Sequence, residues 1–371
     1  MQPADGYPWE RHMSEMWRVI DTGLRPAAQN IALNRALLEA RQAEEIPSTL
    51  RFLRFAPSAL LGYHQSAEQE FNLDYCKANG IAIQRRITGG GAIYFDPAQL
   101  GWELYLHRRD VGTSDMQAIA RRICHAAATA ISALGVDARY RPRNDIEVDG
   151  RKISGTGGAF DGEALLYQGT LLIDFDVEKM LRVLRIPAEK LSDKAIASAR
   201  ERVANLTDLL GRRPDPDLIK RNLTEAFESE FDVEFQAGDL TLTEHARYQV
   251  ALAEIDTPDW IDLVRRPASD MPLYESVQKF AGGMLRASLT YDRLTHRIRQ
   301  VGFSGDIFVS PRRTIADLEA ALRDTSVERM EHNVRVFFTG RDVDMLALTP
   351  DDFIAVIRLA VQQPIVASSR T

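Results

Sequence analysis

The pattern of apolar and polar positions changes between a strand period and a helix period along the chain. Residues 49–55 read TLRFLRF, and this alternation predicts a strand, as do the patterns at residues 100–107 and 164–173. Residues 27–45 and 114–134 carry apolar side chains near helical spacing and predict two longer helices. Because strands and helices mix without strict strand–helix–strand repeats, we expect an α+β fold.

Shorter elements fill the spaces between these segments. Residues 145–148 and 152–154 flank Asp149-Gly150, a dipeptide that favours the two-residue turn of a β-hairpin. We therefore predict a hairpin near the middle of the chain. Helical patterns also occur at residues 67–79, 177–185, 193–210 and 216–230.

A proline-rich stretch divides the chain in two. Residues 251–272 show little periodicity and are interpreted as a linker. The division gives an N-terminal domain, residues 1–250, and a C-terminal domain, residues 273–371. In the C-terminal domain, residues 288–303 have strand character and residues 315–322 have helical character, so a small α+β unit is expected there.

The charge balance and the cysteine content argue against several classes of protein. The formal net charge is −7 at pH 7 and the pI about 5.6, whereas general nucleic-acid binders are usually basic. Cys76 and Cys124 do not form a CxxC pair, so neither a zinc site nor a disulfide framework is expected. No apolar run approaches the length of a membrane span, and the first residues lack the pattern of a signal peptide. We expect a cytoplasmic monomer that binds neither membranes nor nucleic acid.

The first candidate for chemistry is the sequence RRITGGGAIY, residues 85–94. Three successive glycines let the backbone adopt positive φ and approach a ligand closely. Their N–H groups can converge on an oxyanion such as phosphate, and Arg86 adds a planar donor. The pattern matches neither a P-loop nor a Rossmann fingerprint. The alternative is a glycine-rich turn with a solvated arginine pair.

The second candidate is the predicted hairpin, NDIEVDGRKISG, residues 144–155. The hairpin brings Asn144 and Asp145 near one end and puts Lys152 on the return strand. A carboxylate beside a lysine suits ATP chemistry, because the acid can hold Mg²⁺ and the lysine can contact a phosphate. The alternative is an exposed hairpin with alternating charges.

Taken together, these two stretches resemble the lipoate–protein ligases, a family within the biotin/lipoate ligase superfamily. The family pattern reads RRxSGGGAVxHD followed by ND-x-x-x-x-G-x-K-x-SG, with the same separation. YQGTLLIDFD and SARERVANLTDLL resemble further family segments in the same order, so the similarity covers roughly residues 16–230. FSGDIF and its surroundings in residues 273–371 resemble the accessory domain of these ligases.

The resemblance implies a catalytic domain with a mixed sheet and flanking helices, followed by a small α+β accessory domain. It implies a ligase that uses ATP to form lipoyl-AMP or octanoyl-AMP and transfers the acyl group to a lysine of a carrier protein. Lys152 then corresponds to the catalytic lysine, and Asp145 to the position that holds Mg²⁺. The residues expected to bind ATP or lipoyl-AMP are Arg86, Gly89, Gly90, Gly91, Ala92, Ile93, Tyr94, Asn144, Asp145, Ser154, Gly155, Gln168 and Gly169.

The carrier and the acyl group stay open. A lipoyl domain of a 2-oxoacid dehydrogenase, the glycine-cleavage H-protein and an H-protein-like lipoate-binding protein all present the same kind of lysine. Phe95 and Gln168 replace histidines of the family pattern, and Gln99 replaces an asparagine. These positions lie near the ligand in the family, so the choice between lipoate and octanoate is not determined.

Three other functions compete with this interpretation. A cysteine-dependent octanoyl or lipoyl transferase of the same fold carries the acyl group on a thiolate, but Cys124 lies in a predicted helix, far from the GRK motif. A biotin ligase shares the fold and a similar glycine–lysine turn, but RRITGGGA favours lipoate. A non-catalytic lipoyl-binding protein would not need Arg86 and Lys152 together. His64 is either a ligand-binding residue or a simple turn residue.

Overall fold

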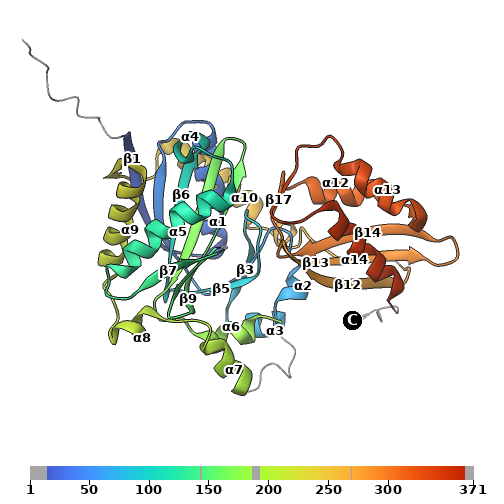
Figure 1. Cartoon of the computed structure of the whole chain (residues 1–371), viewed down its shortest axis with the longest axis horizontal. Helices are drawn as coiled ribbons and strands as arrows, with labels where there is room; N and C mark the ends of the chain where they lie inside the picture. The colour runs from blue at the N-terminus through green and yellow to red at the C-terminus, as the bar shows by residue number, and fades with distance from the viewer. Residues whose placement is uncertain (1–14, 143, 186–192, 269, 364–371) are drawn as a thin grey trace, which may run out of the picture.

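The structure, a computed structural model, describes residues 15–142, 144–185, 193–268 and 270–363. The N-terminal part of the chain is built on a mixed sheet of eight strands (Figure 1). The strands follow the order β11 (Val233–Ala237), β1 (Glu15–Arg25), β2 (Thr49–Phe55), β6 (Gln99–His107), β10 (Ala164–Leu172), β9 (Arg151–Asp161), β8 (Asp145–Val148) and β7 (Ala138–Arg141). β1 runs parallel to β2 and β11, and the other neighbours are antiparallel. The expected α+β class is confirmed.

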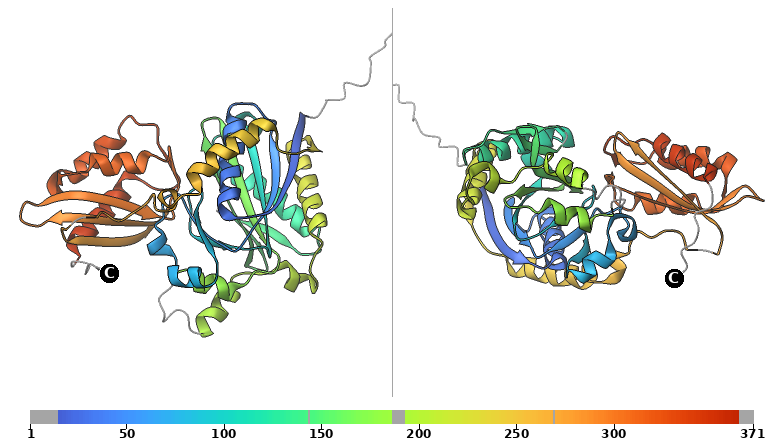
Figure 2. Two further views of the ribbon diagram at one scale, coloured as in Figure 1. Left: turned by 180° about the vertical axis from the view of Figure 1, so that it is seen from behind. Right: turned by 90° about the horizontal axis from the view of Figure 1, so that it is seen from below.

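Helices cover both faces of this sheet (Figure 2). β6 is buried between the two layers, because Trp102 and Leu104 pack in one core and Tyr105 packs in the other. This double burial explains why apolar side chains of β6, QLGWELYLH, occur on both of its faces and why every residue except His107 is buried. The helices are α5 (Met116–Ser132) and α9 (Pro216–Phe231) on one face, and α1 (Ala27–Gln42) and α10 (Leu242–Ile255) on the other.

A second, three-stranded sheet carries the glycine run. Its order is β4 (Ala82–Arg85), β3 (Ser58–Leu61) and β5 (Ile93–Phe95), with β4 parallel and β5 antiparallel to β3. Residues 86–92 connect β4 to β5 and contain the three glycines. Three short helices pack beside this sheet: α2 (Ala67–Glu70), α3 (Leu73–Ala78) and α6 (Val177–Val183).

Two predicted helices are broken in the structure. The helix predicted at residues 67–79 is interrupted at Phe71, which forms an isolated β-bridge to the residue after α6. The helix predicted at residues 193–210 is interrupted at Val203, which forms such a bridge to Lys152. In both places pairing with a distant segment overrides the local helical preference. The second break leaves α7 (Asp193–Arg200) and α8 (Leu206–Leu210).

The C-terminal part of the chain has its own sheet and core. One hydrophobic cluster of buried residues lies entirely within residues 274–360. The antiparallel strands are β12 (Leu273–Phe280), β13 (Gly283–Asp292), β14 (Arg297–Gly305) and β16 (Thr325–Ser326). The helices are α12 (Thr314–Ala321), α13 (Val327–Phe338) and α14 (Pro350–Gln362), and a small ladder joins β15 (Val309–Ser310) to β17 (Asp344–Met345). The strand and helix patterns expected at residues 288–303 and 315–322 are both found.

The segment expected to be a linker, residues 251–272, is folded in its first half. α10 continues to Ile255, and α11 (Pro258–Ile261) follows it. Trp260 Nε1 donates to Arg85 O at 3.0 Å, and Arg85 donates to the carbonyl oxygens of Trp260 and Ile261 at 3.0 and 2.6 Å. The connection between the two parts is therefore shorter than the sequence suggests and covers residues 262–272. The fourteen residues before β1 lie outside the described ranges, and no helix within those ranges is long and apolar enough to cross a bilayer.

Candidate active site

A cavity of about 1260 Å³ lies between the two sheets and the C-terminal part. Gly101 of β6, Gly155 of β9 and Gln168 of β10 belong to its floor. The connection between β4 and β5 forms one wall, and residues 306 and 308–312 of the C-terminal part form another. Segments far apart in the sequence thus enclose one space. Figure 1 shows β3 and β5 beside the C-terminal part.

The glycine run is held by close backbone contacts. Gly90 has a φ of 92°, and a Cβ at Gly62 would lie 1.8 Å from Gly90 O. A Cβ at Gly89 would lie 2.4 Å from Ile307 O in the C-terminal part. No side chain fits at Gly62 or Gly89, so the need for glycine here is steric as well as conformational.

Arg86 is buried behind the glycine run and keeps one unused donor. Its Nη1 donates to Leu60 O at 3.0 Å, and its Nη2 donates to Gly89 O and Gly91 O at 3.2 and 2.8 Å. Within the described part of the chain, Arg86 Nε has no hydrogen-bond partner. Burial lowers the pKa of Arg86 to about 10, so the guanidinium is still cationic at neutral pH. Both Nη atoms are used on the backbone and Nε is sealed from the cavity, so it is the positive charge of Arg86 that favours an anionic group such as a phosphate beside the glycine run.

The predicted hairpin forms and presents Lys152 to the cavity. Asp149 and Gly150 both have positive φ, 50° and 74°, as a two-residue turn of this kind requires. Lys152 Nζ lies 2.7 Å from Asp145 Oδ1, and Arg141 donates to Asp145 Oδ2 at 2.7 Å. The Lys152 side chain is 37% exposed, so its amine is paired but accessible to a ligand.

Two sets of contacts fix the position of Lys152. Its backbone N donates to Arg202 O at 2.8 Å, and its O accepts from Ala204 N at 2.9 Å. The segment between α7 and α8 therefore pairs with β9 beyond the end of β10. A Cβ at Gly155 would lie 2.8 Å from Lys152 Nζ and 2.9 Å from Lys152 Cε, so the lysine side chain rests on the bare backbone of Gly155.

For the ligase reaction that the sequence resemblance implies, Gly155→Ala is expected to lower acyl-AMP formation, because the added methyl group displaces the amine of Lys152. A shift of about 1 Å in a catalytic group can reduce a rate by about 100-fold. The measurement is pyrophosphate release, with the melting temperature as the control for folding. An unchanged rate in a folded protein would show that the position of the amine is not critical.

Most of the expected site residues line the cavity. Asp145 and Ser154 are outside its wall: Asp145 reaches the site through Lys152, whereas Ser154 is fully buried in the sheet. The hydroxyl of Ser154 has no hydrogen-bond partner among the described residues. The expected residues in the wall are Arg86, Gly89, Gly90, Gly91, Ala92, Ile93, Tyr94, Asn144, Lys152, Gly155, Gln168 and Gly169.

The C-terminal part contributes a wall that the sequence did not predict in detail. Arg312 donates to Ile87 O and to Asp161 Oδ2, both at 3.2 Å. The ring of Phe308 covers the glycine run, since a Cβ at Gly90 would lie 2.9 Å from Phe308 Cζ. The resemblance of the FSGDIF segment to the accessory domain points to this region. The contacts of Phe308 and Arg312 across the cavity, however, follow from no local sequence pattern.

The three positions that depart from the family pattern all line the cavity. Gln99 Nε2 donates to Tyr94 O at 3.3 Å, and Gln168 Nε2 donates to Thr88 Oγ1 at 3.3 Å. Phe95 is buried in an apolar core. The two glutamines thus stabilise the wall around the glycine run.

Both cysteines are completely buried and lie outside the cavity wall. Cys124 Sγ lies 3.2 Å from Thr156 Oγ1 and 3.4 Å from Tyr167 OH. Burial raises the pKa of Cys124 and of Cys76 above the ordinary value for a thiol. Both groups are therefore protonated at neutral pH and are poor nucleophiles.

His64 is a buried residue at the edge of the cavity. Burial, together with the charges of Arg85 and Arg312, lowers its pKa to about 3, so the imidazole is neutral at physiological pH. Its backbone O accepts from Gly305 N at 2.9 Å. His64 thus lies at the contact between the N-terminal and C-terminal parts.

Asp145 is the carboxylate expected to hold Mg²⁺. Over the described ranges, no three His, Cys, Asp or Glu side chains gather into a metal site of their own. Mg²⁺ at a nucleotide site often takes only one or two protein carboxylates, with phosphate and water oxygens as the remaining ligands. Both oxygens of Asp145 are paired with cations, Oδ1 with Lys152 and Oδ2 with Arg141, and Asp145 lies outside the cavity wall, so Mg²⁺ at Asp145 stays a prediction.

Comparison with known proteins gives the family. Residues 26–228, more than half of the chain, match the family model of the lipoyl protein ligase A/B catalytic domain. The chain belongs to this family. Within it, a lipoate-protein ligase A subunit 1 from Thermoplasma acidophilum is 33% identical over 227 residues, 58% of this chain and 84% of that protein. An octanoyltransferase LipM from Moorella thermoacetica is 28% identical over 272 residues, 67% of this chain and 98% of that protein.

Solved structures agree with membership of the lipoyl protein ligase A/B family. The bipartite lipoate protein ligase of Thermoplasma acidophilum, studied with its E2 lipoyl domain, has a TM-score of 0.60 and 30% identity, and covers 70% of this chain and 100% of its own. A lipoate-protein ligase A bound with ATP has a TM-score of 0.56 and 28% identity, and covers 67% of this chain and 98% of its own. Arg86, the glycine run and Lys152 all fall within the range that matches the family.

Proposed function

We propose that this protein is an ATP-dependent lipoate–protein ligase, which forms lipoyl-AMP or octanoyl-AMP and transfers the acyl group to a lysine of a lipoyl carrier protein. The main observation in support is that Lys152 and the buried cation Arg86 line the same cavity, whose other walls are rich in glycine and apolar side chains. Such a cavity suits a substrate that combines an apolar tail with phosphates. Relatives named as lipoate–protein ligases, one of them bound with ATP, add to this support.

The first half-reaction joins the acyl carboxylate to ATP. A carboxylate oxygen attacks the α-phosphorus, a new P–O bond forms, and pyrophosphate leaves with the electrons of the broken bond. Lys152 would stabilise the negative charge that develops on the α-phosphate, and Arg86 and the N–H groups of the glycine run would orient the phosphates. Mg²⁺ held by Asp145 would neutralise charge on the phosphate oxygens.

The second half-reaction moves the acyl group to the carrier. The amine of the carrier lysine attacks the acyl carbon, loses a proton as the amide bond forms, and AMP leaves. Lys152, lying over Gly155, would also stabilise charge on the acyl carbonyl oxygen. The carriers we consider are a lipoyl domain of a 2-oxoacid dehydrogenase, the glycine-cleavage H-protein and an H-protein-like lipoate-binding protein.

The direct test incubates the full-length protein with Mg-ATP and lipoate or octanoate and measures pyrophosphate. Candidate carriers are then added, and their masses are measured. Pyrophosphate release together with a lipoyl or octanoyl mass gain on one carrier is the expected result. A protein that binds the acyl acid but releases no pyrophosphate would be a non-catalytic binding module.

A cysteine-dependent octanoyltransferase is the second candidate, because relatives with that name cover the same region of the chain. The buried, protonated state of Cys124 argues against it. We expect the double variant Cys76→Ala, Cys124→Ala to retain ATP-dependent ligation within about threefold. The substitutions change the packing around two buried thiols but remove no group that takes part in the proposed reaction. An acyl thioester trapped on Cys124 by mass spectrometry would instead support the transferase.

A further inference from the structure

The floor of the cavity has room for an extended acyl chain. Gly155 of β9, Thr170 of β10, Gly101 of β6 and Leu53 of β2 are paired in one row across the sheet. Neighbouring strands lie about 4.8 Å apart, so Gly101 is roughly 10 Å from Gly155. Since the Lys152 amine lies over Gly155, an acyl group whose carboxyl end meets Lys152 can extend along this row toward Leu53.

The far end of this row is closed by apolar side chains and by two polar ones. Ile31, Leu38 and Leu53 line the cavity there, together with Asn34 and Glu103. The side chain of Glu103 is only 5% exposed. A buried carboxylate at the end of an apolar channel is unusual, because burial of a charge is costly unless it is paired and hydrogen-bonded.

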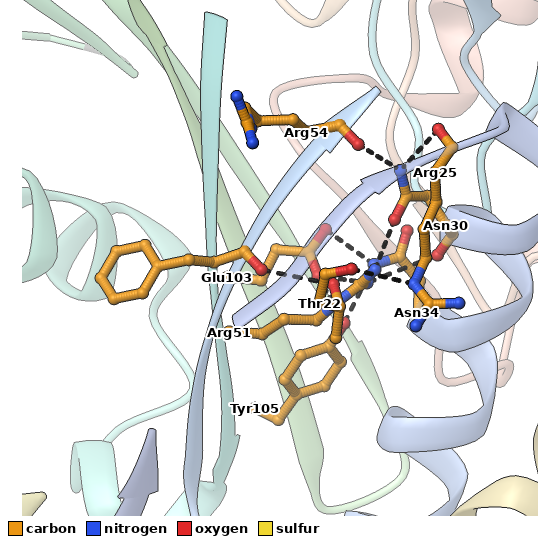
Figure 3. Close-up of polar contacts among 9 residues, drawn as sticks. Thr22, Arg25, Asn30, Asn34, Arg51, Arg54, Glu103 and Tyr105 are labelled. Carbon is orange, nitrogen blue, oxygen red and sulfur yellow. Dashed lines mark hydrogen bonds and ion pairs between the residues drawn. The ribbon is translucent and has the colours of Figure 1, made fainter. Parts of the chain in front are cut away.

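Glu103 is held by a network from three elements, shown in Figure 3. Its Oε2 accepts from Arg51 Nη1 at 2.9 Å and from Tyr105 OH at 2.6 Å, and its Oε1 accepts from Asn34 Nδ2 at 2.7 Å. Arg51 also donates to Asn30 Oδ1 at 2.5 Å and is completely buried. The charge of Glu103 is therefore balanced by Arg51, and its position is fixed.

The network leaves acceptors, not donors, for a ligand. Asn34 Nδ2 uses its two protons on Glu103 and on Tyr105 OH, the latter at 2.9 Å. Asn34 Oδ1 has no hydrogen-bond partner in the described part of the chain, and Glu103 Oε1 accepts only the bond from Asn34. Tyr105 gives its own proton to Glu103. Both residues that line the cavity at this end can thus accept a further hydrogen bond.

We propose that Asn34 Oδ1 and Glu103 Oε1 select an acyl group that carries hydrogen-bond donors at its far end, namely the dithiol of reduced lipoate. This inference rests on the proposed function and names its preferred substrate. Thiol S–H groups are weak donors, but a bond to an ionised carboxylate is stronger than one between neutral groups. The methyl end of octanoate and the closed dithiolane ring of oxidised lipoate have no donor and leave these acceptors unpaired. The dithiol is already reduced when it binds, so the proposal includes no oxidation or reduction step in the site.

The test measures kcat/KM for pyrophosphate release by the full-length protein with dihydrolipoate, lipoate or octanoate as the only acyl acid. We expect dihydrolipoate to exceed octanoate by about tenfold, since one hydrogen bond to a charged group contributes about that much. The octanoate reaction is run in the same reductant as the dihydrolipoate reaction. Equal values for dihydrolipoate and octanoate would overturn the inference.

Glu103→Gln tests the mechanism of selection. The new amide points its N–H₂ group at Asn34, which must then turn its own amide so that Oδ1 accepts and Nδ2 faces the cavity. A donor replaces an acceptor there, so the dihydrolipoate-to-octanoate ratio should fall toward one. Asn34→Leu removes the other acceptor, which lies on α1, and should lower the same ratio. This second variant tests the inference if Glu103→Gln does not fold. The matched control is Glu254→Gln, at an exposed partner of Arg35, which should leave the ratio unchanged.

Binding measurements separate this inference from the proposed function. The dissociation constants of dihydrolipoate and octanoate are measured by calorimetry without ATP. Preferred binding of dihydrolipoate without any pyrophosphate release would support the inference and overturn the ligase function. Pyrophosphate release with equal kcat/KM and equal binding would support the ligase function and overturn the inference.

Discussion

Lys152→Ala is expected to lower the rate of acyl-AMP formation by about 100-fold or more, because one preorganised donor at a developing charge typically contributes about that much. The structure gives a reason to expect little loss of stability. Lys152 is partly exposed, and Asp145 keeps its ion pair with Arg141 when the lysine is removed. The measurement is pyrophosphate release with Mg-ATP and the acyl acid.

The matched control for this variant is Arg151→Ala, one position earlier on β9. Successive side chains of a strand point to opposite faces, so Arg151 is not expected to reach the cavity, and it is absent from the cavity wall. Its rate should stay within about twofold of the wild type, as is usual for a surface change away from the site. Near-normal acyl-AMP formation by a folded Lys152→Ala protein would contradict the role we propose for the lysine.

Removal of the C-terminal part is the second change with a large expected effect. A protein that ends at residue 268 keeps α10 and α11, with the hydrogen bonds between Trp260 and Arg85. It loses Phe308 and Arg312, which cover the glycine run and contact Ile87. We expect it to fold, because the C-terminal core is separate, but to form acyl-AMP at least about tenfold more slowly, because water enters the open site.

The truncated protein should still transfer lipoate from supplied lipoyl-AMP to a carrier, since it holds Arg86, the glycine run and Lys152. Residues 270–371 added as a separate chain should restore part of the first step, and the restoration should rise with their concentration. Full activity of the truncated protein in both steps would show that the C-terminal part has another role. An insoluble truncated protein would show that the two parts depend on each other for folding.

The sequence predicts those features that depend on local pattern. β2 and β6 follow from apolar periodicity, and the hairpin before Lys152 follows from Asp149-Gly150, whose two positive φ angles are a property of the dipeptide itself. The breaks at Phe71 and Val203 could not be predicted, because each is caused by a β-bridge to a segment far along the chain. Local preference carries no information about such a partner.

The residues of the candidate site also fall into two groups, those that the sequence predicts and those that it does not. Arg86 and Lys152 stand in motifs short enough to recognise, and both line the cavity. Asn34 and Glu103 were missed because their relation depends on α1 packing against β6, and neither has a neighbour in sequence that points to the other. The single indication was a charged residue inside the apolar run of β6.

Arg85 has a consequence for how far the C-terminal part can travel. Its guanidinium donates to the carbonyl oxygens of Tyr63 and Ile261, at 2.7 and 2.6 Å, and so anchors the start of the connection directly beside Arg86. Residues 262–272, fully extended, span at most about 40 Å. The C-terminal part is therefore tethered by a short connection whose first residue is fixed beside the candidate active site. Whatever orientation it adopts, its first strand stays within about 40 Å of Ile261. Its local concentration at the glycine run therefore never falls to that of a free partner.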